Sequence, residues 1–151
     1  AQFNHHGLPA KKEEDWKYTS LWAMGQQAFT HQAQTSSITV EQCEQLALLT
    51  DAYRVVIIDG IFSAELSQLD NLPAGIVIRP LSAGLELAQP HLGNQINPEK
   101  AGFNALNTML MQEGVVISVD SDTQIAKSIE LLVINTGPWL SIMSVSMILL
   151  H

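Results

Sequence analysis

The spacing of hydrophobic residues changes once along the chain, near Glu113. Before this point apolar residues recur at three- and four-residue intervals in two stretches, which is typical of helices with one buried face. After it the period falls to two through Val115–Val119 and Ser128–Asn135, which is typical of strands. The pattern predicts an α+β fold, with a mixed helical region over residues 1–113 and the first strands of a sheet or β-helix over residues 114–151.

Two helices are predicted within residues 1–113. Thr39 can cap the first helix, with Gln42 three residues later as in a capping box. We expect this helix to end near Asp51–Ala52. Its apolar face consists of residues at helical spacing: Val40, Cys43, Leu46, Ala47 and Thr50. A second helix is predicted over Phe103–Met111, with Gly114 as its C-terminal cap.

A β-hairpin is predicted between the two helices. Tyr53–Ile58 is rich in β-branched residues, and Asp59–Gly60 suits the positive φ angles of a two-residue hairpin turn. Asn71–Gly75 reads as a turn. It leads into a short strand, Ile76–Ile78, which Pro80 ends.

The segment Gly7–Thr19 combines a turn, dense mixed charge and two large aromatic residues. The proline favours an extended backbone at Leu8, and the charges place the segment at the surface. Half-buried positions suit both Trp16 and Tyr18, since each has an apolar body and a polar tip. Over residues 11–30 we expect one or two helical turns with three aromatic side chains facing inward: Trp16, Trp22 and Phe29.

Three segments carry a resemblance to a known family. They are Gly7–Thr19, Tyr53–Phe62 with Ala64–Ser67 after it, and Phe103–Asn107 leading into Gly114–Val119 and Ile129–Val133. Together and in this order they resemble the SufB/SufD family of iron-sulfur cluster assembly proteins, and within it the SufD members. The resemblance implies that the strands after Gly114 open a parallel β-helix.

The resemblance also implies a role. It suggests a SufD-like component of the SufBCD complex, a non-catalytic scaffold subunit with SufB-like and SufC-like partners. In the family, SufD pairs with SufB through the β-helix, and the ATPase SufC docks on a C-terminal domain. These parts, with the cysteine and histidine positions tied to cluster assembly, lie beyond His151. No site residue is therefore carried over, and the iron-sulfur cluster is assigned to the whole complex.

The sequence ends at His151, where relatives continue through a long β-helix, so the resemblance implies a truncated N-terminal portion. A shortened gene, a disturbed reading frame and a deliberately shortened protein all remain open. A third strand could lie within Ile142–Leu150, although Pro138–Leu150 fits the family pattern poorly. Without further rungs we expect an open edge there, and self-association through this C-terminal strand.

Charge and hydropathy limit the kinds of partner and the cellular compartment that can be expected. The chain has 151 residues and a formal net charge of −8, from 7 Lys and Arg against 15 Asp and Glu, so nucleic acid is not predicted as a partner. Charged residues make up 15% of the chain, against about 25% in typical domains. No apolar run reaches the roughly 18 residues of a membrane span, and residues 1–6 lack the order of a secretory signal. We expect a cytoplasmic protein.

Residues for chemistry are sparse. Cys43 is the one cysteine, so it cannot supply the three or four ligands of a cluster, and its neighbours Glu41 and Glu44 disfavour a reactive thiolate. The five histidines lack helical metal-site spacing: His5, His6, His31, His91 and His151. No P-loop or nucleophile motif occurs, and the acidic groups at Glu13–Asp15 and Asp120–Asp122 read as solvated turns. We therefore predict no enzyme activity and no catalytic, cofactor-binding or metal residues.

Two alternatives remain open. A small enzyme would require that two of four polar side chains meet in space: His31, His91, Glu65 and Glu86. A self-contained interaction module would require that the chain itself covers its C-terminal strand.

Overall fold

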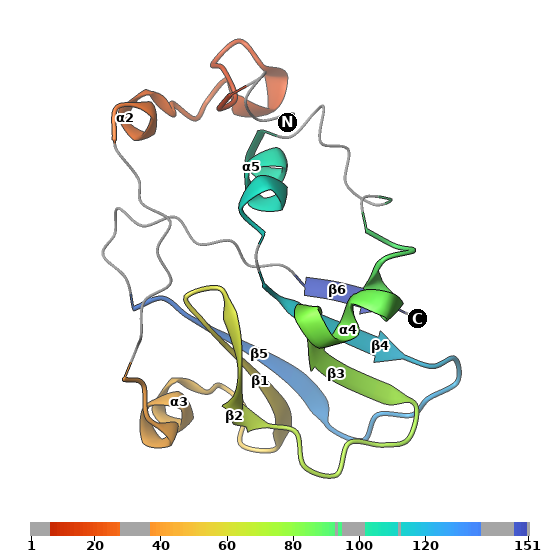
Figure 1. Cartoon of the computed structure of the whole chain (residues 1–151). Helices are drawn as coiled ribbons and strands as arrows, with labels where there is room; N and C mark the ends of the chain where they lie inside the picture. Colours follow the sequence, from red (N-terminus) through yellow and green to blue (C-terminus); the bar gives the residue numbers. More distant parts are fainter. Residues whose placement is uncertain are drawn as a thin grey trace.

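Two three-stranded sheets form the centre of the fold (Figure 1). The computed structural model describes residues 7–27, 37–92, 94, 102–111, 113–136 and 147–150. The helical elements are η1 (Glu14–Trp16), α2 (Trp22–Gly25), α3 (Val40–Leu46), α4 (Leu81–Ala88) and α5 (Gly102–Leu110). The strands are β1 (Ala52–Ile58), β2 (Ile61–Gln68), β3 (Ile76–Pro80), β4 (Val115–Val119), β5 (Ser128–Ile134) and β6 (Met147–Leu150).

Each sheet combines one antiparallel and one parallel pair. In the first sheet β1 lies between antiparallel β2 and parallel β5. In the second, β4 lies between antiparallel β3 and parallel β6. After β3 the chain thus passes from the second sheet (β4) to the first (β5) and back to the second (β6).

The α+β class is confirmed, but the expected β-helix is not present among the described residues. The strands after Gly114 pass from one sheet to the other and back only once, so no repeated coil is present among these residues, and each sheet also contains an antiparallel strand, β2 or β3. Strands from both sides of residue 113 pair within each sheet. The division into residues 1–113 and 114–151 stays a prediction.

The core lies between the two sheets and extends onto the outer face of each central strand. Val55 and Ile57 of β1 pack with Val115 and Ile117 of β4 between the sheets. On its other face β1 packs with α3 and β5, through Val56, Cys43 and Ile134. On its other face β4 packs with α4, through Val116, Leu81 and Ala88. Burial on both faces explains the unbroken apolar runs in β1 and β4.

The first predicted helix begins where expected, but in the structure it ends earlier than predicted. The Thr39 Oγ1 atom accepts a bond from the Gln42 backbone N–H, and the Gln42 side chain accepts one from the Thr39 N–H, so the capping box is confirmed. The helix ends at Leu46 because Ala47 is extended, with ψ 139°. Of the predicted apolar face only Cys43 is buried, since Val40 and Leu46 remain exposed.

The hairpin is confirmed. Asp59 and Gly60 have φ of 51° and 86°, and Ile58 pairs with Ile61 across the turn. Asp59 is also buried, and its carboxylate accepts hydrogen bonds from the backbone N–H and hydroxyl of Thr136. The turn is therefore tied to the end of β5.

The second half of residues 1–113 holds one unexpected helix. No helix is predicted from the sequence at α4. This helix packs so closely on β4 that a Cβ atom at Gly84 would lie 2.9 Å from the Val116 Cβ. The predicted helix near Phe103 is present as α5. Gly114 does not cap it, because α5 ends at Leu110 and the Gly114 carbonyl accepts the Leu81 N–H at 2.9 Å.

Candidate functional site

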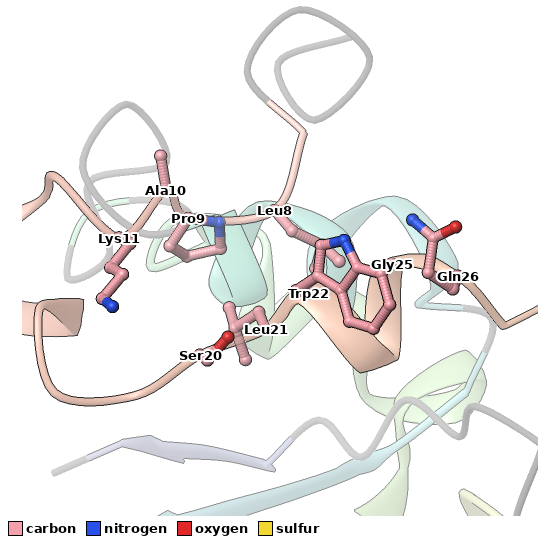
Figure 2. Close-up of a pocket in the computed structure, with 9 residues that line it drawn as sticks. All are labelled: Leu8, Pro9, Ala10, Lys11, Ser20, Leu21, Trp22, Gly25 and Gln26. Atoms are coloured by element: carbon pink, nitrogen blue, oxygen red, sulfur yellow. The ribbon is translucent and has the colours of Figure 1, made fainter.

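An open groove lies between two stretches of the N-terminal segment, residues 8–11 and 20–26 (Figure 2). Its volume is about 460 Å³. The side chains that define its character are Leu8, Pro9, Lys11, Leu21, Trp22 and Gln26. The lining is mainly apolar, with one charged group, the Lys11 ammonium. No ion pair of Lys11 occurs within the part of the chain that the structure describes.

Contacts with α5 position the first stretch of the groove. Trp16 packs on Phe103 with ring centroids 5.1 Å apart and an angle of 41° between the planes. Pro9 is buried, and a Cβ atom at Gly102 would lie 2.8 Å from its Cδ atom. The absence of a side chain at Gly102 therefore lets the Leu8–Pro9 stretch approach the helix.

A hydrogen-bonded turn joins the two stretches. The Glu13 carboxylate accepts the Ala10 N–H at 2.7 Å, and the Glu13 N–H donates to the Ala10 carbonyl at 2.9 Å. The Lys17 ammonium lies 3.4 Å from the Glu14 carboxylate, an exposed pair one helical turn apart. The predicted surface segment with short helical turns is confirmed by η1 and α2.

Two of the predicted aromatic positions are wrong. Trp22 is 74% exposed and Tyr18 is 92% exposed, where we expected an inward and a half-buried side chain. The reason for Trp22 is that α2 is a single turn with no buried residue, so it has no core face. Tyr18 contacts the Lys17 ammonium, 5.0 Å from its ring centroid. Trp16 is partly buried as expected, and Phe29 lies outside the described residues.

A buried ion pair is a second cluster of polar side chains. The Arg54 Nε atom lies 2.7 Å from the Glu130 Oε2 atom. Glu130 Oε1 also accepts the N–H groups of Leu48 and Leu49, and Arg54 also donates to Gln68 and to the Leu49 carbonyl. The hydrogen bond from Arg54, helped by those from the two N–H groups, lowers the pKa of Glu130 despite its burial. All of these partners of Arg54 and Glu130 belong to the chain itself. The ion pair therefore connects β1, β5 and the turn before β1.

The remaining candidates are not joined to one another. Glu65 lies on β2, Glu86 on α4 and His91 just after α4, and no ion pair connects them among the described residues. His31 lies outside those residues, as do His5, His6 and His151. Within the described ranges no three His, Cys, Asp or Glu side chains gather as a metal site would require.

Cys43 and the acidic turns behave as the sequence indicated. The Cys43 side chain is buried, and burial raises its pKa against the opposing charge of Arg54. Glu13–Asp15 and Asp120–Asp122 are exposed. Among the described helices, none has the length and apolar character needed to cross a membrane.

Comparison with known proteins decides the family. The family model for the SufBD protein N-terminal region matches residues 1–131. The chain belongs to the SufBD family. The range that matches contains the groove, α5 and β1 to β4, so the site described above lies within the family's N-terminal region.

Two curated relatives are similar to this SufBD chain. An iron-sulfur cluster assembly SufBD family protein of Synechocystis is 28% identical over 130 residues, covering 83% of this chain and 28% of the relative. The iron-sulfur cluster assembly protein SufD of Escherichia coli is 39% identical over 61 residues, covering 40% of this chain and 14% of SufD. The chain thus spans well under half the length of these relatives. The family resemblance read from the three sequence segments is confirmed.

The groove residues of the second stretch were missed by sequence reasoning. Ser20–Gln26 contains one large aromatic residue and no apolar partner at helical spacing that could bury it. That pattern was the available signal for an exposed tryptophan. The Arg54–Glu130 pair had no such signal, because the two residues are 76 positions apart.

Proposed function

We propose that this chain is a SufD-like part of a SufBCD iron-sulfur cluster assembly complex, and that it works as a non-catalytic scaffold with SufB-like and SufC-like partners. The match of the SufBD N-terminal region to residues 1–131 carries the proposal. The SufD assignment is supported by the similarity to E. coli SufD and by the Gly7–Thr19 segment.

The cluster is cargo of the whole complex and not a group held by this chain. Cys43 is the one cysteine, and its thiol is buried. Iron-sulfur clusters are held by several thiolates at once. The proposed location is the cytoplasm, as expected from the sequence.

The strand order supports a β-helix that begins in residues 114–151. From β4 the chain crosses to the other sheet as β5 and returns as β6, parallel to β4. A coil of a β-helix follows the same course, returning each strand parallel to its predecessor in the same sheet. In this proposal the two earlier strands cover one edge of the first coil, because β1 pairs with β5 and β3 pairs with β4.

The groove is the candidate contact surface of the scaffold. Its rim carries Trp22, and tryptophan is among the residues enriched where proteins bind one another. The groove is held on α5 by Trp16 and Pro9, so its first stretch is positioned before any partner binds.

A chimeric SufD tests the proposal. The matching N-terminal region of E. coli SufD is replaced by this chain, and co-purification with E. coli SufB and SufC is measured. We expect a complex with all three subunits. Because the E. coli portion keeps the β-helix and the C-terminal domain, recovery of both partners tests whether this chain replaces the N-terminal region of SufD. The contribution of the groove is the difference between two variants of the chimera: Trp22→Ser should lower the recovered SufB or SufC, whereas Tyr18→Ser, which removes an exposed aromatic outside the groove, should not. A folded chimera that recovers neither partner would contradict the proposal.

A further inference from the structure

The groove of the N-terminal segment combines an apolar middle with three polar side chains that have no partner among the described residues. These are the Lys11 ammonium, the Ser20 hydroxyl and the Gln26 carboxamide. Lys11 lies at one end of the groove and Gln26 at the other, with Leu8 and Leu21 between them (Figure 2). A ligand that complements the groove therefore carries a negative charge at the Lys11 end, apolar atoms in the middle and hydrogen-bonding groups along its length.

The charge of Lys11 is available to such a ligand. Of the two glutamates that follow, Glu13 accepts the Ala10 N–H at 2.7 Å, and Glu14 lies 3.4 Å from the Lys17 ammonium. Neither carboxylate forms an ion pair with Lys11 in the described part of the chain. Because the chain has a formal net charge of −8, an acidic segment is repelled by the molecule as a whole and attracted at this end of the groove.

The shape of the groove fits an extended peptide better than an enclosed small molecule. Small-molecule pockets bury about 70–90% of the ligand surface, whereas Trp22 on the rim is itself 74% exposed. An extended segment needs cover on one face only, and its backbone offers donors and acceptors to Ser20 and Gln26. An apolar side chain of that segment would pack on Trp22, and tryptophan contacts are among those that contribute most at protein interfaces.

The groove is not an edge that further strands of the proposed β-helix would extend. Its two stretches, residues 8–11 and 20–26, belong to no strand, and the first is held on α5 (Figure 1). A strand joins a sheet through the free N–H and C=O groups of another strand. The ligand of the groove is therefore recognised by side chains.

We propose that the groove binds an extended segment of a partner subunit that carries an acidic residue close to a large apolar one. The carboxylate would pair with Lys11, and the apolar side chain would pack on Trp22. This inference rests on the proposed scaffold role, because it names the kind of partner segment that the contact surface takes. A ligand of this chemistry uses the one charged group of the groove, its apolar middle and its exposed tryptophan together.

Peptide selection on the full 151-residue chain tests the chemistry. Short random peptides displayed on phage are selected on the wild type after depletion on Trp22→Ser. We expect the selected sequences to carry Asp or Glu close to Leu, Phe or Trp. A selection that leaves no binder, or binders without an acidic residue, would overturn the proposal.

A charge exchange tests the role of Lys11. One selected peptide is labelled, and its binding is measured by fluorescence anisotropy. Lys11→Glu should weaken binding about fivefold or more, and a peptide with Lys in place of its acidic residue should bind this variant better than it binds the wild type. Tyr18→Ser, outside the groove, is the control and should bind like the wild type. Equal binding by Lys11→Glu and the wild type would contradict the proposal.

Photo-crosslinking in the SufD chimera bound to SufB and SufC identifies the source of the segment. Ser20 is replaced by p-benzoylphenylalanine, and mass spectrometry should find it linked to an acidic and apolar segment of SufB or SufC. Leu48, which is 91% exposed in the turn after α3, is the control position and should not give that product. A link within SufD only, or no link to either partner, would overturn the proposal.

The two proposals fail in different ways. The peptide selection uses no Suf subunit, so its failure contradicts the groove ligand and leaves the scaffold role intact. A folded chimera that recovers neither SufB nor SufC contradicts the scaffold role, and with it the assignment of the segment to a partner subunit.

Discussion

Arg54 is a buried charge that the fold compensates completely. Its guanidinium donates to Glu130, to Gln68 and to the Leu49 carbonyl, so three separate chain segments surround it. Glu130 in turn accepts two backbone N–H groups of the turn before β1. Because removal of one partner leaves the other charge buried and unpaired, such pairs are sensitive to substitution even when their net contribution to stability is small.

Glu130→Gln should destabilise the protein by about 3–5 kcal/mol, since Arg54 then keeps its charge without a carboxylate beside it. Urea unfolding at neutral pH measures this loss. Asp51→Asn is the control, because it removes the exposed pair between Asp51 and Lys127 and should have a much smaller effect. Equal stabilities of Glu130→Gln and the wild type would show that the pair does not hold Arg54 as described.

The pH dependence of the wild type follows from the same pair. The pKa of Glu130 is lowered in the folded state from its ordinary value of 4.5, so its contribution is fully present above that value. It is lost as the pH falls through the lowered folded-state pKa, where the carboxylate takes up a proton. The stability difference between wild type and Glu130→Gln should therefore shrink in acid, and a difference that grows below pH 4.5 would contradict this account.

At the scale of elements, the N-terminal segment depends on a close approach to α5. Pro9 occupies the space that a side chain at Gly102 would fill, and Trp16 packs on Phe103 one residue further along the helix. These two contacts position one side of the groove. The segment is otherwise exposed, so its order rests on few buried groups.

Gly102→Ala should release the N-terminal segment from α5, because the new methyl group would lie 2.8 Å from the Pro9 Cδ atom and 3.0 Å from the Gly7 carbonyl oxygen. Trypsin cleavage after Lys17, followed by mass spectrometry, should then become about tenfold faster, which corresponds to about 1.4 kcal/mol less protection. Gly25→Ala is the matched control, since its methyl group meets no atom within 4 Å. If both variants are cleaved at the wild-type rate, the close approach does not hold the segment.

At the scale of the whole molecule, features set by residues close in sequence were predictable, whereas features that depend on contacts between distant residues were not. The capping box at Thr39, the Asp59–Gly60 turn and the strand β4 each depend on residues close in sequence. The helix α4 was missed because Gly84 weakens its intrinsic signal, and its packing on Val116 supplies the stability. Likewise the early end of α3 reflects hydrogen bonds from Leu48 and Leu49 to Glu130, about 80 residues away.

The candidate site was partly predictable for the same reason. The Gly7–Thr19 segment was recognised as distinctive, and it forms one side and the joining turn of the groove. The exposure of Trp22 was not predictable, because burial depends on whether a neighbouring element covers the side chain. Nor does one sequence show that the expected β-helix strands share their sheets with the antiparallel β2 and β3.

We propose that this SufBD chain acts as a scaffold within a complex and does not hold the cluster itself. The most direct test is anaerobic reconstitution with iron and sulfide, followed by visible absorption. The isolated chain should show no stable cluster band, and its spectrum should not change in Cys43→Ser. The SufD chimera bound to SufB and SufC should show the band of the E. coli complex. A persistent band on the isolated chain that disappears in Cys43→Ser would contradict the account.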